Sequence, residues 1–317
     1  MRALFFGTPE IAVPALEALH SIATVSLVVC QPDRPAGRGL EPRAPAVKVK
    51  ALELGLRVEQ PTKIKTPDFA ELVRSQEADV ALVIAYGRIL PKAILEAPRR
   101  GCMNLHASIL PKYRGAAPIT WAVVDGETRT GISLMQMDEG MDTGPVYRIL
   151  DVPIGRDMTS GQLAVELAAC AATMVREVLP MAVAGDIEAA RQDETGATHA
   201  RMLDKEDGRI DFSKPAKRVH DHVRGMTPWP GAFTTITPNG LPKTLKILAT
   251  RTLSGDAGAP PGTVVVAHRG RVEIACGEGR IELIVAQLEG KKALPAPELV
   301  GGRTILQGMV LGAGAPA

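Results

Sequence analysis

The sequence predicts an α/β protein with a doubly wound, mostly parallel sheet, followed by a small β-barrel of the OB type. In the first half of the chain, short apolar runs alternate with helical patterns, which is typical of a parallel sheet covered by helices on both faces. In the last third, short strand patterns follow one another closely between Gly and Pro residues, which is typical of a barrel. The length of 317 residues is enough for two domains.

Strands and helices of the predicted sheet alternate along the chain. The strands are expected at residues 3–6, 25–30, 58–60, 80–85 and 102–106, and the helices at 11–20, 47–54, 67–74 and 91–96. Two further strands, at 131–137 and 146–152, precede one long helix at 160–184. Sheets of this kind bind ligands beyond the carboxyl ends of their strands, so we expect the chemistry near His106.

The apolar periodicity is lost at residues 185–205, which are mostly polar. We therefore expect a first domain at 1–188, a linker at 189–205, a barrel domain at 206–310 and a tail at 311–317. The barrel strands are expected at 233–236, 245–249, 263–266, 272–275 and 281–287. The chain after Gly308 is rich in Gly and Ala, and we expect it to fray.

Composition and charge narrow the class of protein. The chain is 45% hydrophobic, its four cysteines are scattered without metal-ligand spacing, and its apolar stretches are too short or too interrupted for a signal peptide or a membrane span. We therefore expect a cytoplasmic protein without a metal and without a membrane role. The net charge is only +2, but residues 205–317 carry +5, and residues 34–65 carry eight basic side chains against three acidic ones. These two regions suit a polyanion, although ordinary solvated faces remain an alternative.

Three side chains stand out as catalytic candidates. Asn104 and His106 lie two residues apart at the end of a predicted strand, so both point to the same face, and Asp142 follows in a later loop. An amide, an imidazole and a carboxylate suit a reaction in which negative charge grows on a carbonyl oxygen while a nucleophile loses protons. Asp142 could instead be a turn or capping residue. A serine triad with Ser108 is disfavoured, because the nucleophile-elbow pattern is missing.

Several motifs carry a resemblance to a known family. They are Phe6-Gly7-Thr8-Pro9, Gln31 to Gly39 (QPDRPAGRG), Ala85 to Pro91 (AYGRILP), Asn104 to Gly115 (NLHASILPKYRG), Met135 to Asp138 (MQMD), Asp142-Thr143-Gly144 and Pro228-Trp229-Pro230-Gly231. With these motifs the chain resembles the methionyl-tRNA formyltransferases over nearly its full length. The resemblance implies a Rossmann-like formyltransferase domain followed by a tRNA-binding barrel of the OB-fold type. It also implies a role in translation initiation.

The resemblance also implies substrates and site residues. The formyl donor would be 10-formyltetrahydrofolate, bordered by Ser108, Ile109, Leu110, Pro111, Tyr86 and Gly87, and no metal would take part. The acceptor would be initiator methionyl-tRNA, recognised by Arg34, Arg38 and Arg43, and the enzyme would be a monomer. The recognition loop continues with Leu40-Glu41-Pro42-Arg43, where the family often has two lysines after Gly39. A formyltransferase acting on an amino sugar or another small amine, and a noncatalytic RNA-binding protein, remain the alternatives.

Overall fold

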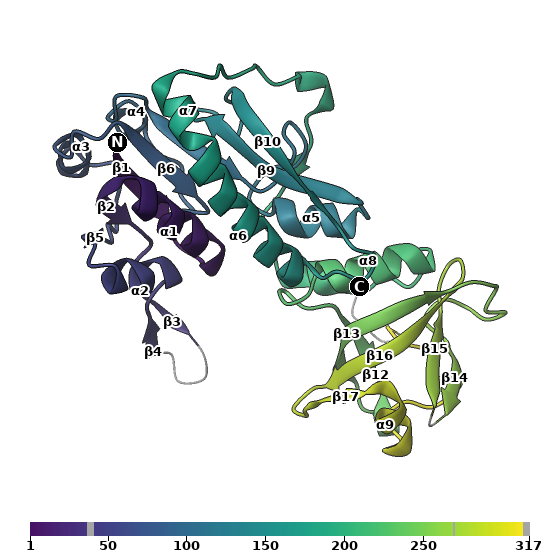
Figure 1. Cartoon of the computed structure of the whole chain (residues 1–317). Coiled ribbons are helices and arrows are strands. Elements are labelled where there is room, and N and C mark those ends of the chain that lie inside the picture. Colours follow the sequence, from purple (N-terminus) through teal and green to yellow (C-terminus); the bar gives the residue numbers. More distant parts are fainter. Residues whose placement is uncertain (37–40, 269, 313–317) are drawn as a thin grey trace. The chain divides into compact units, whose positions relative to one another are not determined.

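The computed structural model describes residues 1–36, 41–268 and 270–312, and it divides into two compact units (Figure 1). The first unit comprises residues 1–118, 129–153 and 164–201. The second comprises residues 119–128, 154–163 and the chain from Met202 onward. Residues 189–201, which the sequence assigns to a linker, thus belong to the first unit.

A seven-stranded sheet forms the middle of the first unit, in the order β10-β9-β7-β6-β1-β2-β5. Its strands are β1 (Arg2–Gly7), β2 (Thr24–Val29), β5 (Val58–Glu59), β6 (Val80–Ile84), β7 (Cys102–His106), β9 (Arg129–Gln136) and β10 (Val146–Pro153). Five neighbouring strands, β5, β2, β1, β6 and β7, are parallel, and β9 and β10 add an antiparallel edge. The predicted mostly parallel, doubly wound sheet is therefore confirmed.

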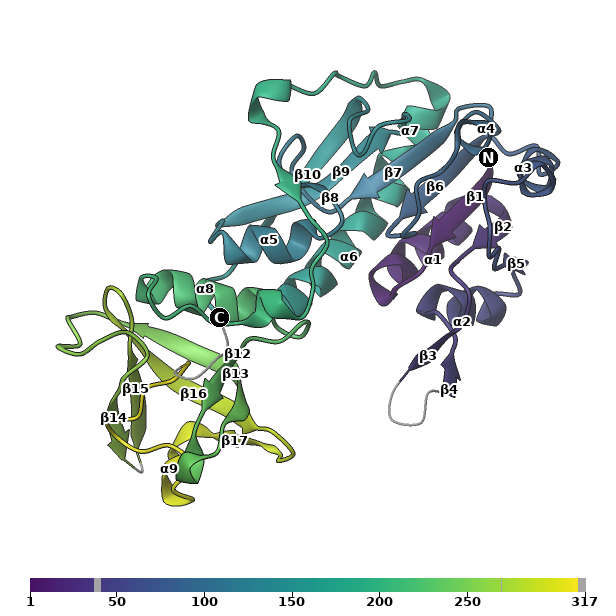
Figure 2. The ribbon, with the colours of Figure 1, turned by 180° about the vertical axis from the view of Figure 1, so that it is seen from behind.

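Helices cover both faces of this sheet. They are α1 (Val13–Ile22), α2 (Ala46–Glu53), α3 (Pro67–Arg74), α4 (Lys92–Leu95), α6 (Ser160–Glu177) and α7 (Leu179–Ala184). Both ribbon views show α1 and α6 on one face (Figures 1 and 2). On the opposite face, Leu4 and Phe6 of β1 share a buried cluster with Phe69 of α3 and Ile94 of α4. Thr66 caps α3 by accepting a hydrogen bond from the Phe69 backbone nitrogen at 3.3 Å.

The prediction of one continuous helix at 160–184 is wrong. The chain leaves regular helix geometry at Val178, whose φ is −108°, and α7 begins anew with Pro180 in its first turn. Proline has no N–H to donate to the preceding turn, and its ring clashes with the carbonyl four residues earlier. A helix can begin with proline but cannot run through it undisturbed, so the chain forms two helices.

The second unit contains an antiparallel sheet in the order β12-β13-β16-β15-β14, and β17 also pairs with β16. Its strands are β12 (Phe233–Ile236), β13 (Lys243–Leu253), β14 (Val264–His268), β15 (Arg271–Ala275), β16 (Arg280–Leu288) and β17 (Ala293–Pro295). Helices α8 (Ala216–Gly225) and α9 (Ala296–Gly301) belong to this unit, and α5 (Pro118–Val124) lies almost wholly within it. The small C-terminal barrel is confirmed. Strand β17 and helices α5, α8 and α9 were not predicted from the sequence.

The end of the chain is ordered further than the sequence suggests. The backbone nitrogen of Gly308 donates to Val264, and that of Leu311 donates to Gly262, both at 2.8 Å. Gly312 then donates to the Thr235 carbonyl of β12 at 2.8 Å. The expectation that the chain frays after Gly308 is therefore wrong up to Gly312, because the two edge strands β14 and β12 offer backbone groups that need partners.

Short strands complete the first unit. An antiparallel hairpin joins β3 (Arg34–Ala36) to β4 (Glu41–Arg43), and a parallel pair joins β8 (Arg114–Gly115) to β11 (His199–Ala200). Single turns of 3-10 helix lie at Glu10–Ala12, Glu194–Gly196, Glu206–Gly208 and Pro238–Gly240. Across residues 1–36, 41–268 and 270–312, no helix is both long and apolar enough to cross a membrane.

His222 on α8 makes the stability of the protein depend on pH. Its Nε2 atom is buried, and it has no hydrogen-bond partner in the described part of the chain. Burial lowers the pKa of His222 from its ordinary value of 6.5. Between the lowered pKa and 6.5, the unfolded chain binds more protons at this position than the folded protein. The free energy of unfolding therefore falls as the pH falls through this window.

Replacing His222 with Gln should remove this contribution. Lowering the pH from about 7.5 to about 5.5 should then cost the variant less stability than it costs the unchanged protein. Urea unfolding at the two pH values measures the difference. Equal losses in both proteins would mean that His222 does not titrate differently on unfolding.

Candidate active site

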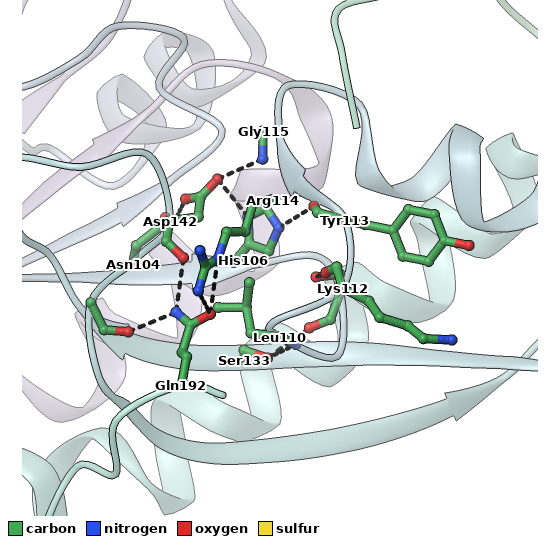
Figure 3. Close-up of polar contacts among 12 residues, drawn as sticks. Asn104, His106, Leu110, Lys112, Tyr113, Arg114, Gly115, Ser133, Asp142 and Gln192 are labelled. Carbon is green, nitrogen blue, oxygen red and sulfur yellow. Dashed lines mark hydrogen bonds and ion pairs between the residues drawn. The ribbon is translucent and has the colours of Figure 1, made fainter. Parts of the chain in front are cut away.

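The end of strand β7 presents the two candidate donors. Asn104 pairs with Met135 of β9 and His106 pairs with Ser133, so both side chains leave the same face of the strand. His106 is only 5% exposed. Its Nε2 atom lies 2.9 Å from the Tyr113 backbone oxygen (Figure 3). Because a carbonyl oxygen can only accept, Nε2 carries the hydrogen, and Nδ1 is the ring atom left to exchange a proton.

Asp142 meets both of these side chains. Its Oδ1 accepts a hydrogen bond from Asn104 Nδ2 at 3.3 Å, and its Oδ2 lies 3.5 Å from His106 Nδ1 (Figure 3). Oδ2 also accepts from the Gly115 backbone nitrogen at 2.8 Å. The structure thus brings Asn104, His106 and Asp142 together, and the carboxylate is held at a fixed place between an amide and an imidazole.

Gly115 can approach Asp142 because of its unusual backbone. Its φ is 117°, in the region that favours glycine, and a Cβ atom there would lie 2.7 Å from the Ala200 backbone oxygen. Ala116 and Ala117 also donate to that oxygen, at 2.8 and 3.3 Å. The pairing of β8 with β11 therefore places the backbone nitrogen that holds Asp142.

Further residues that were not predicted from the sequence support the site. Gln192 donates through Nε2 to the backbone oxygens of Asp142 and Gly144, at 2.8 and 2.7 Å. Arg114 donates to Gln192 and to Glu194. Arg114 lies inside a motif noted from the sequence, but Gln192 and Glu194 lie in the stretch that was assigned to a linker. Nothing in their local sequence signals a contact with Asp142.

Ser133 of β9 holds the loop after His106 through two hydrogen bonds. The Ser133 hydroxyl donates to the Ser108 backbone oxygen at 2.7 Å and accepts from the Leu110 nitrogen at 3.2 Å. The Ser108 hydroxyl donates to the Lys112 backbone oxygen at 2.6 Å, so it closes a turn. This contact argues against Ser108 as a nucleophile paired with His106. Ile109 is half-buried and Leu110 is buried, and a cis peptide bond joins Leu110 to Pro111.

Tyr86 and Gly87 lie at the end of β6, beside a cavity of about 910 Å³. The Tyr86 ring is buried edge-on against Phe6, with ring centroids 5.4 Å apart. Burial raises the pKa of Tyr86 to about 12. The Tyr86 backbone oxygen accepts from Thr8 and Gln31, which joins the loops at the carboxyl ends of β1, β2 and β6. This cavity therefore opens at the end of the sheet where ligands are expected.

Two of the three predicted tRNA-binding arginines lie on strands β3 and β4. Arg34 and Arg43 are exposed, sit directly opposite each other across the hairpin and line the same cavity. Arg38 lies outside the described residues. Asp33 at the base of the hairpin is held by Lys48 Nζ at 2.7 Å and by Gln60 Nε2 at 2.8 Å. The hydrogen bond from Lys48, followed by that from Gln60, lowers the pKa of the Asp33 carboxyl group.

Metal ligands do not gather at this site. Within the described ranges, no group of three or more His, Cys, Asp or Glu side chains is arranged to hold a metal ion. Cys30, Cys102 and Cys276 are buried, and burial raises the pKa of each thiol, to about 11 for Cys30 and about 12 for the other two. These thiols are poor nucleophiles and poor ligands at neutral pH.

The chain matches a known family in both of its units. Residues 1–179 match the formyl transferase family, and residues 202–304 match the formyl transferase C-terminal domain. Both units are thus formyl transferase domains.

Curated relatives narrow this class. Methionyl-tRNA formyltransferase from Sorangium cellulosum is 66% identical over 314 residues, covering 98% of this chain and all of the relative. The protein of the same name from Myxococcus xanthus is 46% identical, covering 97% of this chain and 96% of the relative. The chain therefore belongs to the formyl transferases, and among them to the methionyl-tRNA formyltransferases.

Solved structures share the fold at low identity. The sugar 3N-formyl transferase WlaRD superposes with a TM-score of 0.66 at 17% identity, covering 92% of this chain and 99% of that one. HypX from Aquifex aeolicus, in a complex with tetrahydrofolic acid, gives a TM-score of 0.61 at 17% identity, covering 96% of this chain and 47% of that one. At such identities the likeness concerns the fold.

Replacing Ser133 with Ala should destabilise the loop that follows His106. The change leaves the buried Leu110 nitrogen and Ser108 oxygen without the hydroxyl that serves both, which should cost about 1–3 kcal/mol of unfolding free energy. Urea unfolding measures the loss. Ser75→Ala is the control, because the Ser75 hydroxyl donates to Leu72 at an exposed helix end. Equal small losses in the two variants would contradict the bridging role of Ser133.

Proposed function

We propose that this protein transfers the formyl group of 10-formyltetrahydrofolate to the amino group of initiator methionyl-tRNA. Two near-full-length relatives named methionyl-tRNA formyltransferase support formyl transfer to this acceptor. The observation that carries the mechanism is the Asp142 carboxylate held between the Asn104 amide and the His106 ring. The reaction supplies N-formylmethionyl-tRNA for translation initiation.

The first step is attack of the neutral methionine amine on the formyl carbon. A carbon–nitrogen bond forms, and the formyl oxygen becomes an oxyanion in a tetrahedral intermediate. Asn104 gives one amide hydrogen to Asp142 and keeps a second for this oxygen, and a protonated His106 Nδ1 supplies another donor. Donors fixed before the reaction stabilise such an oxyanion without reorganisation.

The second step is the transfer of protons. The attacking nitrogen becomes positively charged and must lose a proton, and N10 of the folate must gain one before it leaves. Asp142 accepts the first proton, His106 Nδ1 gives its own proton to N10, and Asp142, 3.5 Å away, then returns a proton to Nδ1. The His106 ring stays oriented throughout, because Nε2–H remains bonded to the Tyr113 carbonyl. Breaking the carbon–N10 bond then releases tetrahydrofolate and the formylated amine.

The folate binds against the Ser108-to-Pro111 loop, whose shape is fixed by Ser133. Tyr86 and Gly87 extend its site at the end of β6, where they line a cavity that the Ser108-to-Pro111 loop does not line. Tyr86 contributes packing and its backbone, because its ring is buried against Phe6.

The tRNA binds to the β3–β4 hairpin and to the basic second unit. Arg34 and Arg43 face each other directly, and like charges in that position are unfavourable until an anion lies between or beside them. Arg38, which lies between Arg34 and Arg43 in the sequence, reads the acceptor stem. The first unit carries catalysis and the β3–β4 part of tRNA recognition, and residues 206–310 supply the second tRNA-binding region. The enzyme works as a monomer in the cytoplasm, where charged tRNA is found.

Replacing His106 with Ala tests the mechanism. Turnover should fall by roughly 10² or more, because single oxyanion donors contribute about that much. The assay combines 10-formyltetrahydrofolate with charged initiator tRNA and follows the mass of the aminoacyl group. The affinity for tRNA should stay nearly unchanged.

Two results would contradict the proposal. Near-normal turnover of His106→Ala would remove this residue from the mechanism. Failure of the unchanged protein to formylate methionyl-tRNA, together with formylation of an amino sugar or binding of tRNA without turnover, would favour one of the alternative functions.

Replacing Arg34 and Arg43 together with Ala tests the acceptor. Losing two phosphate contacts should weaken kcat/KM for charged tRNA and reduce its dependence on the logarithm of salt concentration by roughly one per arginine. The KM for the folate is measured alongside, because both arginines also line the cavity beside Tyr86 and Gly87. Arg74→Ala is the control, because Arg74 is an exposed arginine on α3 that pairs with Glu71. An unchanged salt dependence in the double variant would show that these arginines do not contact the tRNA.

A further inference from the structure

The guanidinium group of Arg114 lies beside Gln192, close to Asp142 (Figure 3). The residue is 3% exposed, and it donates through Nε and Nη2 to Gln192 Oε1 at 3.1 and 2.8 Å. Nη1 and Nη2 donate to the two carboxylate oxygens of Glu194, each at 2.9 Å. The Glu194 hydrogen bond is the main reason that the pKa of Arg114 is raised, and the charge of Asp142 adds to it. A buried fork with these bonds has one orientation.

Gln192 connects Arg114 to the loop that carries Asp142. Arg114 occupies its Oε1, so its Nε2 must point the other way. There it donates to the backbone oxygens of Asp142 and Gly144, at 2.8 and 2.7 Å. One side-chain amide thus spans the turn at Thr143 and ties both of its ends to Arg114.

Asp142 needs such support because of its backbone conformation. Its φ is 55°, in the left-handed region that non-glycine residues rarely adopt. A conformation of this kind persists where the surrounding structure determines it from several sides. A return to an ordinary conformation would swing the carboxylate away from His106 Nδ1 and from the Gly115 nitrogen.

We infer that Gln192, oriented by Arg114, is a positioning residue for formyl transfer. It holds the Asp142 backbone so that the carboxylate meets Asn104 and His106, and it acts through the backbone of Asp142. The inference rests on the proposed function, in which Asp142 exchanges protons during the reaction. A displacement of about 1 Å in such a group is enough to reduce the rate by about 10².

Gln192→Glu is the main test. The new side chain keeps an oxygen for Arg114 but sets a second oxygen against the Asp142 and Gly144 carbonyls. We expect kcat to fall about tenfold or more, with KM for folate and for tRNA within about twofold of the unchanged enzyme. Gln192→Met removes the same two donations without adding charge and should also lower kcat. It keeps the test valid if the Glu variant does not fold.

Gln76→Glu is the matched control. Gln76 is a buried glutamine whose Nε2, like that of the half-buried Gln192, donates to a backbone oxygen, here that of Leu72 at 3.1 Å. This variant should have a lower melting temperature than the unchanged protein. Its kcat, measured well below the melting temperatures of both proteins, should not fall. A purely structural role of Gln192 would give the same pattern and would overturn the inference. A rise in KM at unchanged kcat would overturn it as well.

Asp142→Asn, assayed in parallel, distinguishes a failure of the proposed role of Asp142 from a failure of the positioning role of Gln192. If Asp142→Asn is inactive and folded while both Gln192 variants keep the normal kcat, the proposed function stands and the positioning role falls. If Asp142→Asn stays active, the proposed role of Asp142 fails, and the positioning role fails with it. Inactive Asp142→Asn together with a low kcat of the Gln192 variants is the expected result.

Discussion

The site depends on where one carboxylate is held. Asp142 accepts hydrogen bonds from Asn104 on one oxygen and from the Gly115 backbone on the other, and its second oxygen faces the His106 ring. These partners come from two parts of the first unit, strand β7 and strand β8, so the place of the carboxylate depends on both. Strand β7 fixes Asn104 and His106, while the β8–β11 pair fixes Gly115. The positions of the catalytic side chains therefore depend on strand β7 and on the β8–β11 pair.

Those parts that depend on short-range patterns could be predicted from the sequence. The alternation of apolar runs and helical patterns indicated the parallel strands, because a strand buried on both faces must be apolar throughout. Asn104 and His106 could be paired because side chains two residues apart share a face of a strand. The resemblance carried by the Asp142-Thr143-Gly144 motif linked Asp142 to them. All three meet in the structure.

What could not be predicted depends on partners far apart in the chain. Gln192 lies fifty residues after Asp142 in a polar stretch, and its role comes from a contact that no local pattern encodes. The chain end at Leu311 and Gly312 looked unstructured because Gly and Ala carry little side-chain signal, yet its backbone serves two edge strands. In both cases the hydrogen bonds of the main chain decide the outcome, and composition does not reveal them.

The pairing of β8 with β11 has a consequence for the order of assembly during synthesis. Gly115 leaves the ribosome long before His199 and Ala200, the strand residues that β8 pairs with. Until that later segment has emerged, the backbone of Gly115 lacks its strand partner, even when the parallel sheet up to β7 is complete. Contacts of such long sequence separation form late and slowly. The catalytic centre is thus a late product of vectorial folding, completed by the last residues of the unit it serves.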